Sequence, residues 1–526
     1  MTPMQQAAFT QGLIQESGGD CSTVSTSYAV ADRSRRQVLE ATSEKIRNEW
    51  TPPALCTLHW DSKLTPSLSN VRHLEERLTV VVGDGDHLKL LGVPAYQKGT
   101  DRACGTIIAQ RTCELLQEWN CTEQVVNMAF DTTASNTGHL TAACIAIQQS
   151  LEKPLLWSAC RHHIGELILT QIFNDLKFEA SRSPEITVFI RLRDNWDLVP
   201  HDNSGPLSTC KNNNPTPFLC SLRSDFSQCA SNMAQLKRGD YREFIQLCQV
   251  YLDTTQCPVI FQRPGALHKA RWMAKLLYIL KLALLEQHIA ALPQGTITTR
   301  QQVPKIRQFA DFVSLVYAKW WLTCEKPVDA AWNDLTLYHH LQQYKAVDAG
   351  IAASAIKALE RHLWYLTGEM LPLALFSDKL PVDDRRALAD TILQNKPADQ
   401  PLKFPQLRFG TGYGKPTFPV LTPTTRLADL ANKDCWFGMY QMNIDPAFLQ
   451  LPVENWDGNE AFQAEKAKTS SINVVNDCAE RGMKLTSDFV EAARTERHLQ
   501  NVLQTVEHDR AKTPNLRFSK RTVDNS

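Results

Sequence analysis

Short apolar runs bounded by turn residues characterise the chain from Pro53 to about residue 180. Three of these runs are rich in β-branched and aromatic residues: 56–62, 76–85 and 87–96. Because only short turns separate them, they predict the strands of an antiparallel meander. Two later apolar runs, each flanked by segments with helical spacing, predict buried strands at 124–130 and 154–160.

The resulting order of elements is three strands, then helix, strand, helix, strand, helix. This order predicts an α/β core with a mixed five-stranded sheet and flanking helices, which is also the order of an RNase H-like core. After residue 181 long segments with helical period follow one another without a strand signal. We therefore expect a large all-α insertion that interrupts the core.

These changes of pattern predict five regions. The expected regions are a polar N-terminal arm (1–52), the first part of the core (53–180), a mainly helical insertion (181–450), the final acid-bearing helix of the core (451–510), and a basic flexible tail (511–526). A chain of 526 residues exceeds what one hydrophobic core usually serves, so a core with an insertion also agrees with the length.

Composition places the protein among intracellular globular proteins. The first twenty residues lack a basic segment followed by an apolar stretch, so no signal peptide is expected. The most apolar stretch contains Lys275, Lys281 and Glu286, which a membrane-spanning helix would avoid at its centre. Fifteen scattered cysteines, mostly inside apolar runs, are typical of reduced core thiols. Lys plus Arg equals Asp plus Glu at 56 each, so the net charge gives no sign of a nucleic-acid partner.

Two acidic residues lie where predicted strands end. Asp61 closes the first strand, and Asp131 closes the strand at 124–130, just before a small polar loop. Adjacent strands of one sheet would bring the two carboxylates within reach of a shared divalent cation. Hard cations such as Mg²⁺ prefer oxygen ligands, and a pair of them can activate a water or a 3′-hydroxyl for phosphoryl displacement.

A third acid is expected from a helix packed on the sheet. Asp477 and Glu480 are three residues apart and share one helix face, and chemistry alone does not choose between them. Taken singly, each of these acids has an ordinary interpretation. A strand-end Asp is usually a turn former, and a helical Asp-x-x-Glu pair is usually a solvated face.

The order of HWD, AFDTTASNTG and SACRHH, followed by a helical insertion and an acid-bearing helix, resembles the DDE/DDD transposases of eukaryotic cut-and-paste elements. It is most similar to the hAT, P-element and Kolobok branch, in which a Cys/Asp-x-x-His signature follows the second acid. Here that signature is Cys160-Arg161-His162-His163, and its last histidine lies 163 − 131 = 32 residues after Asp131.

The resemblance implies a nuclear enzyme that cleaves and transfers DNA strands with Mg²⁺ or Mn²⁺ and works as a homo-oligomer on transposon ends. It implies that Asp61, Asp131 and Glu480 bind the metal, with Asp477 as the alternative third acid. It also implies that Cys160 and His163 form the signature, with His163 near the scissile strand. The pair Arg271-Trp272 resembles an Arg-Trp pair of the hAT insertion domain that contacts DNA.

Several of these residues have competing interpretations. Cys160 and His163 lack a second ligand pair at zinc-site spacing, so a zinc site is not favoured. His162 and His163 on sequence alone are typical of a histidine pair at a helix start. The segment 79–92 lacks the phosphate-loop pattern, and a hairpin turn at 83–86 is favoured. The aromatic residues at helical spacing are more typical of a core than of base stacking: Trp272, Trp320, Trp321, Trp364 and Tyr365.

Two other functions remain open at this point. A domesticated, catalytically inactive DNA- or protein-binding scaffold agrees with the neutral charge and with the lack of a Cys/His zinc-finger pattern before the core. A structure-specific nuclease without strand transfer is the third possibility.

Overall fold

The computed structural model describes residues 3–23, 27–70, 72–85, 87–96, 101–138, 142–178, 186–210, 216–231, 236, 238–255, 257–265, 271–398 and 417–512. These residues form two compact units. Unit 1 comprises the described residues up to Trp157 and those from Asn476 onward, and unit 2 comprises those from Ser158 to Val475. The divisions therefore fall at 157/158 and 475/476, whereas the sequence pattern suggests boundaries near 180 and 450.

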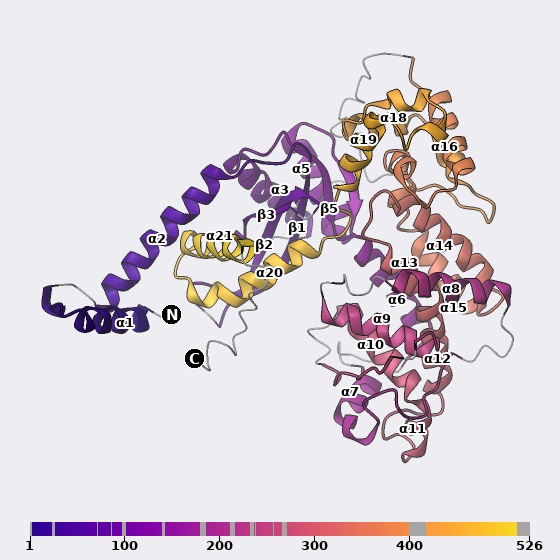
Figure 1. Ribbon diagram of the computed structural model, residues 1–526, viewed down its shortest axis with the longest axis horizontal. Coiled ribbons are helices and arrows are strands. Elements are labelled where there is room, and N and C mark those ends of the chain that lie inside the picture. Colours follow the sequence, from indigo (N-terminus) through magenta and orange to yellow (C-terminus); the bar gives the residue numbers. More distant parts are fainter. Residues whose placement is uncertain are drawn as a thin grey trace. The chain divides into compact units, whose positions relative to one another are not determined.

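Unit 1 is built on a mixed sheet (Figure 1). The strands of this sheet are β1 (Cys56–Pro66), β2 (Leu74–Asp84), β3 (His87–Gly92), β4 (Ala95–Tyr96), β5 (Val125–Phe130) and β6 (Leu156–Ala159), and the division at 157/158 falls within β6. The sheet order is β3-β2-β1-β5-β6, with β4 paired to β2. β2 runs antiparallel to β1 and β3, and β1 runs parallel to β5, so the predicted meander and mixed sheet are confirmed. The sheet has six strands and not five because of the short β4.

The β2–β3 connection is a tight hairpin. Asp84 pairs with His87, and Gly85 between them has φ +47°, a left-handed conformation that glycine adopts without strain. A Cβ atom at Gly83 would lie 2.0 Å from the carbonyl oxygen of His87, so the close approach of the two strands requires glycine there. The hairpin interpretation of this glycine-rich segment is confirmed.

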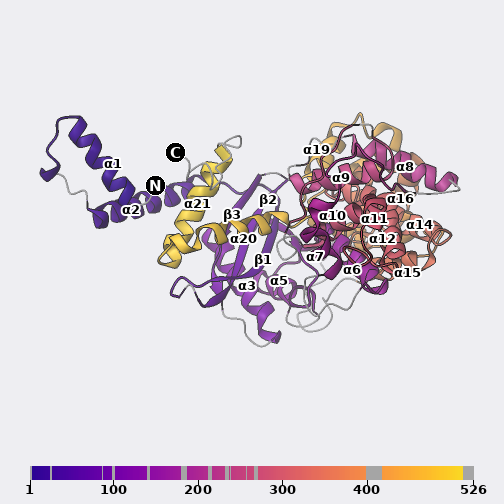
Figure 2. The ribbon, with the colours of Figure 1, turned by 90° about the horizontal axis from the view of Figure 1, so that it is seen from below.

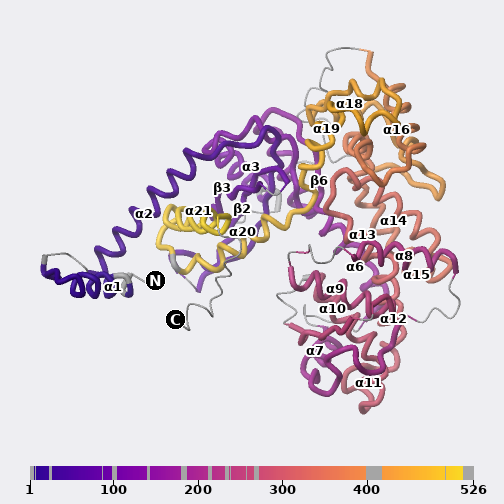
Figure 3. Tube along the Cα trace, viewed as in Figure 1, coloured from indigo at the N-terminus to yellow at the C-terminus, as the bar shows by residue number. Residues whose placement is uncertain are grey.

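The helices of unit 1 come from both sides of the insertion in the chain. They are α1 (Pro3–Glu16), α2 (Tyr28–Glu49), α3 (Asp101–Glu118), α4 (Ala134–Thr137), α5 (Ala143–Leu151), α20 (Asp477–Phe489) and α21 (Glu496–Lys512). α20 packs on β1 and β2, and α3 packs on β2, β3 and α5 (Figure 2). The tube in Figure 3 shows how α20 and α21, at the yellow end of the chain, return to strands formed by its first third.

Side chains of α21 cover the edge strand β3. The Gln500 side-chain amide donates to the Leu91 carbonyl over 2.5 Å, and that of Gln504 donates to the Leu90 carbonyl over 2.6 Å. The Glu507 carboxylate accepts from the Leu90 backbone N–H over 2.8 Å. These three residues lie on one helix face, and they satisfy backbone groups that an uncovered edge would offer to another strand.

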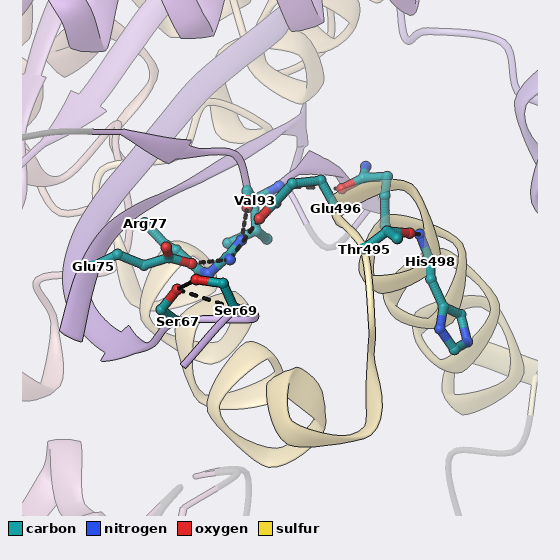
Figure 4. A network of polar contacts seen from close by, with 9 residues as sticks. Ser67, Ser69, Glu75, Arg77, Val93, Thr495, Glu496 and His498 are labelled. Carbon is teal, nitrogen blue, oxygen red and sulfur yellow. Dashed lines mark hydrogen bonds and ion pairs between the residues drawn. The ribbon is translucent and has the colours of Figure 1, made fainter. Parts of the chain in front are cut away.

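A buried arginine ties the sheet to the start of α21 (Figure 4). The Arg77 side chain on β2 is fully buried, and its two terminal nitrogens donate to the Glu496 carboxylate, each over 2.8 Å. Arg77 also donates to the Val93 carbonyl over 3.2 Å and pairs with Glu75. The arrangement fixes where α21 begins relative to β2.

Unit 2 is helical. Its α-helices are α6 (Arg161–Asp175), α7 (Thr187–Asp194), α8 (Pro217–Ala230), α9 (Gly239–Tyr251), α10 (Arg271–Leu284), α11 (Glu286–Ala291), α12 (Gln302–Phe312), α13 (Ala318–Leu322), α14 (Ala330–Tyr344), α15 (Ala349–Leu359), α16 (Val382–Gln394), α17 (Leu427–Leu430), α18 (Asp434–Gln441) and α19 (Glu460–Ser470). The apolar segment 351–376 is not one helix. After α15 it continues as short 3₁₀ turns at 364–366 and 371–376, and Pro372 lies at the start of the second turn, where a proline is tolerated.

Candidate active site

The register of two parallel strands indicates that Asp61 lies near Asp131. β1 pairs with β5 through Thr57–Asn127, Leu58–Met128 and His59–Ala129. The paired register ends at His59–Ala129, and extending it by two residues would set Asp61 opposite Asp131, which directly follows β5. β1 continues to Pro66, so Asp61 does not close the strand as the sequence suggests. It lies two residues after His59, the last residue of β1 that pairs with β5.

The two acids lie on the same face of the sheet. The Asn127 side-chain amide donates to the Thr57 hydroxyl over 3.2 Å, and strand alternation then puts Asp61 and Asp131 on that same face. The intervening residues Trp60 and Phe130 point to the opposite face, where their rings stack with centroids 5.7 Å apart. Both carboxylates are only partly buried, while the aromatic residues below them are buried.

Helix α20 lies on the acid face. Asp61 pairs across β1 and β2 with Thr79, and a Cβ atom at Gly482 of α20 would lie 2.5 Å from the Thr79 Cγ2. Only a glycine allows the helix to approach the sheet this closely at that point. Just before the helix, the Asn476 amide contacts His59 and Trp60 of β1. α20 is therefore held against the strand that carries Asp61.

Helix geometry distinguishes the two candidate third acids. Glu480 lies four residues after Asn476 and so on the same side of α20, the side that contacts β1. Cys478 lies on the other flank and joins the apolar cluster of β2 and β3 with Val81 and Leu90. Asp477 is about 100° around the helix from Asn476, further from the β1 side. Both acids are partly buried, and the geometry favours Glu480.

The loop after β5 is fixed by a helical turn that the sequence did not indicate. We expected an irregular polar loop, but residues 134–137 form the short helix α4. Its Asn136 accepts from the Trp60 indole N–H over 3.0 Å and donates to the Asp131 carbonyl over 2.9 Å. The backbone at Asp131 is thereby tied to the strand that carries Asp61.

The donor set suits a hard divalent cation. Mg²⁺ is often held by only one or two carboxylates, with waters and substrate phosphates completing its shell. Asp61 and Asp131 supply such a pair. Within the described residues, no group of three or more His, Cys, Asp and Glu side chains is arranged to hold a metal ion. Cys478 packs in the apolar cluster with Val81 and Leu90, and burial raises the pKa of its thiol to about 12.

The Cys160-Arg161-His162-His163 block lies in unit 2, where it begins α6. Cys160 precedes the helix and is buried. The Arg161 side chain is fully buried and pairs with Asp334, with nitrogen–oxygen distances of 2.7 and 3.0 Å. It also lies over the rings of Trp320 and Tyr365 at 5.2 and 4.8 Å. The centre of the signature is therefore a structural ion pair.

The two histidines of this block differ in their surroundings. His162 is buried, and its ring stacks on Trp321 with centroids 5.6 Å apart. His163 is 18% exposed, and its Nδ1 lies 3.4 Å from the Glu166 carboxylate. His163 belongs to unit 2 and the acids to unit 1, so its proposed approach to the scissile strand stays a prediction.

The candidate DNA-contacting pair lies at the start of α10. Trp272 is buried, with its ring 5.9 Å from that of Trp321, so the core interpretation of this tryptophan holds. The Arg271 side chain lies outside the described residues. The remaining aromatic residues of the predicted cluster are buried as well: Trp320, Trp321, Trp364 and Tyr365.

Comparison of the sequence with protein-family models and with curated proteins gives no match. In the described part of the chain, none of the helices has the length and apolar character needed to cross a membrane. The function is therefore inferred from the geometry of the acids and of the residues that hold them.

Proposed function

We propose that the protein is a DDE-type transposase, or a host protein derived from one, that cleaves and transfers DNA strands with Mg²⁺ or Mn²⁺. The observation that carries the proposal is the β1–β5 register, whose extension by two residues would bring Asp61 and Asp131 together on the face covered by α20. Glu480 on that helix is the third acid. DNA would be the partner, and the nucleus the place of action.

The sheet supports an RNase H-like core. An antiparallel β1–β2–β3 meander is extended by β5 and β6 on the other side of β1, with β1 parallel to β5. This is the arrangement that the RNase H-like interpretation requires, with the first acid on the central strand and the second after its parallel neighbour. A helix far along the chain, α20, then packs on the acid face.

The chain's own residues would divide the work as follows. Asp61 and Asp131 would hold the cation, and one Asp61 oxygen is oriented by the Ser62 backbone N–H over 2.9 Å. Glu480 would close the site from α20. Trp60 and Phe130 keep the opposite face of these strands apolar and dry. When bound, the cation would polarise the attacking oxygen and stabilise the leaving oxygen of the phosphodiester.

The direct test is metal-dependent nicking of supercoiled plasmid by the full-length chain. We expect activity with Mn²⁺ or Mg²⁺ that Asp61→Ala, Asp131→Ala and Glu480→Ala each remove. Asp488→Ala is the matched control, because Asp488 is an exposed acid on α20 that pairs with Lys484. Activity that survives Asp131→Ala would refute the proposed site. Joined products would separate a transposase from a structure-specific nuclease, which yields cleaved products only.

The alternative is a catalytically inactive scaffold that keeps the fold. The balanced charge of the chain and the lack of a three-residue ligand group among the described residues favour it. Calorimetric titration with Mn²⁺ separates the two functions. A scaffold should show no binding that depends on Asp61 and Asp131, whereas the enzyme should show binding that either alanine variant weakens.

A further inference from the structure

Two asparagine side chains meet at Trp60, the residue before Asp61. Asn136 comes from α4, five residues after Asp131, and Asn476 comes four residues before Glu480. Each is at least nine-tenths buried. They contact different atoms of Trp60, so both contacts exist together.

Asn136 links the loop after β5 to β1. Its Oδ1 accepts from the Trp60 indole N–H over 3.0 Å, and its Nδ2 donates to the Asp131 carbonyl over 2.9 Å. The Trp60 ring is itself held by stacking on Phe130, the residue before Asp131. The backbone that carries Asp131 thus has two separate attachments to the strand that carries Asp61.

Asn476 links the start of α20 to the same strand. Its Nδ2 donates to the Trp60 carbonyl over 2.8 Å, so its Oδ1 is left as the acceptor for His59, whose Nδ1 lies 3.1 Å away. The first turn of α20 is therefore held against His59 and Trp60, the two residues before Asp61.

We propose that Asn136 and Asn476 are positioning residues that set Asp131 and Glu480 around Asp61. This inference rests on the proposed function. Each amide uses both its donor and its acceptor to join an acid-bearing segment to β1. Loss of either contact would let one carboxylate move relative to Asp61 without removing a ligand. Substitution of residues that orient metal ligands without binding the metal typically weakens metal affinity by about 10- to 100-fold.

Asn127 provides a matched control on the same two strands. It is a buried asparagine of β5 that also joins β5 to β1, through the Thr57 hydroxyl at 3.2 Å. It lies four residues before Asp131, so its loss should weaken the sheet without loosening the acids. A purely structural role for Asn136 or Asn476 predicts the same effect as for Asn127.

The test is Mn²⁺ affinity of the full-length chain, measured by calorimetry and by electron paramagnetic resonance, together with the midpoint of urea unfolding. We expect Asn136→Ala and Asn476→Ala each to weaken Mn²⁺ binding by about tenfold. All three variants should lower the unfolding midpoint by similar amounts. Asn127→Ala, however, should leave the Mn²⁺ affinity within about twofold of wild type. Unchanged affinity in both positioning variants, or an equal loss in Asn127→Ala, would overturn the inference.

Trp60→Phe sharpens this result because it removes the indole N–H together with the five-membered part of the ring system. A six-membered ring remains to face Phe130, and the backbone carbonyl remains for Asn476. We expect Trp60→Phe to weaken Mn²⁺ binding as Asn136→Ala does, and the double variant to weaken it no further. Additive losses would show that Asn136 does not act through Trp60. If the wild-type chain shows no carboxylate-dependent binding at all, the proposed function itself fails, which is a different outcome.

Discussion

The acid face of unit 1 and the start of α6 in unit 2 both carry a dense set of polar residues, but the two regions use them differently. In unit 1, Asp61, Asp131 and Glu480 are partly exposed, and buried amides hold the backbone around them. In unit 2, Arg161 and Asp334 have fully buried side chains that satisfy each other. A charged group can do chemistry only where a ligand can reach it, so the comparison points to unit 1.

Burial also changes what a substitution should do in each region. A partly exposed carboxylate costs little to remove from the fold, whereas removing one partner of a buried ion pair leaves an uncompensated charge. Substitution of the unit 1 acids should therefore lower activity with little loss of stability. Substitution of Arg161 or Asp334 should mainly lower stability.

The largest expected effect is the loss of activity in Asp131→Ala. We expect metal-dependent strand cleavage to fall at least about 1000-fold, equivalent to about 4 kcal/mol of transition-state stabilisation. The thermal midpoint should stay within a few degrees of wild type, because Asp131 is partly exposed. Single-turnover cleavage and thermal unfolding on the same preparation measure both. A large drop in the midpoint would mean that Asp131 is structural, as Asp334 is.

Asp334→Ala should show the reverse pattern. We expect the free energy of unfolding to fall by about 3 kcal/mol, because Arg161 would stay buried without its counter-ion. The Trp320 indole N–H, which donates to Asp334 over 2.9 Å, would lose its acceptor as well. Urea unfolding followed by tryptophan fluorescence measures the change. The double variant Arg161→Met/Asp334→Leu is the control, and it should recover most of the loss since it leaves no buried charge.

Much of the sheet was predictable from the sequence. The alternation of apolar residues and the short connections between the first three strands predict the meander, and the helical segments that follow it predict parallel pairing of β5. Asp61 and Asp131 follow from that topology, because residues in register on neighbouring parallel strands lie together. This part of the fold was predictable because it follows from local patterns in the sequence.

The third acid and the positioning residues were not predictable in this way. Asp477 and Glu480 differ only by rotation about α20, which is set by the Gly482–Thr79 approach and by Asn476. These contacts join residues about 400 positions apart, and a single sequence carries no sign of them. The Cys160–His163 block shows the same limit, because its spacing says nothing of the burial of Arg161.

Another buried acid of unit 2, Glu369, extends the comparison through the pH dependence of stability. Burial and the nearby Asp434 carboxylate raise the pKa of Glu369 to about 7. Because the folded-state pKa lies above the usual 4.5, folding stability should fall as pH rises from about 4.5 through 7. Glu369→Gln should remove this loss. We expect it to exceed wild type by on the order of 2 kcal/mol at pH 8 and to match it at pH 4.5, in urea titrations at both values. A difference independent of pH would contradict the assignment.

The smallest effect tests how closely α20 must approach the acid face. In an exposed helix Gly→Ala stabilises by about 1 kcal/mol, but a Cβ atom at Gly482 would lie 2.5 Å from the Thr79 Cγ2. We therefore expect Gly482→Ala to destabilise unit 1 by about 1 kcal/mol, because the clash outweighs the gain in helix propensity. Thr79→Ser removes that methyl group. In the Thr79→Ser background the same substitution should become neutral or stabilising, as measured by urea unfolding. If Gly482→Ala destabilises equally in both backgrounds, the Thr79 methyl does not set the position of α20, and the placement of Glu480 loses one of its two anchors.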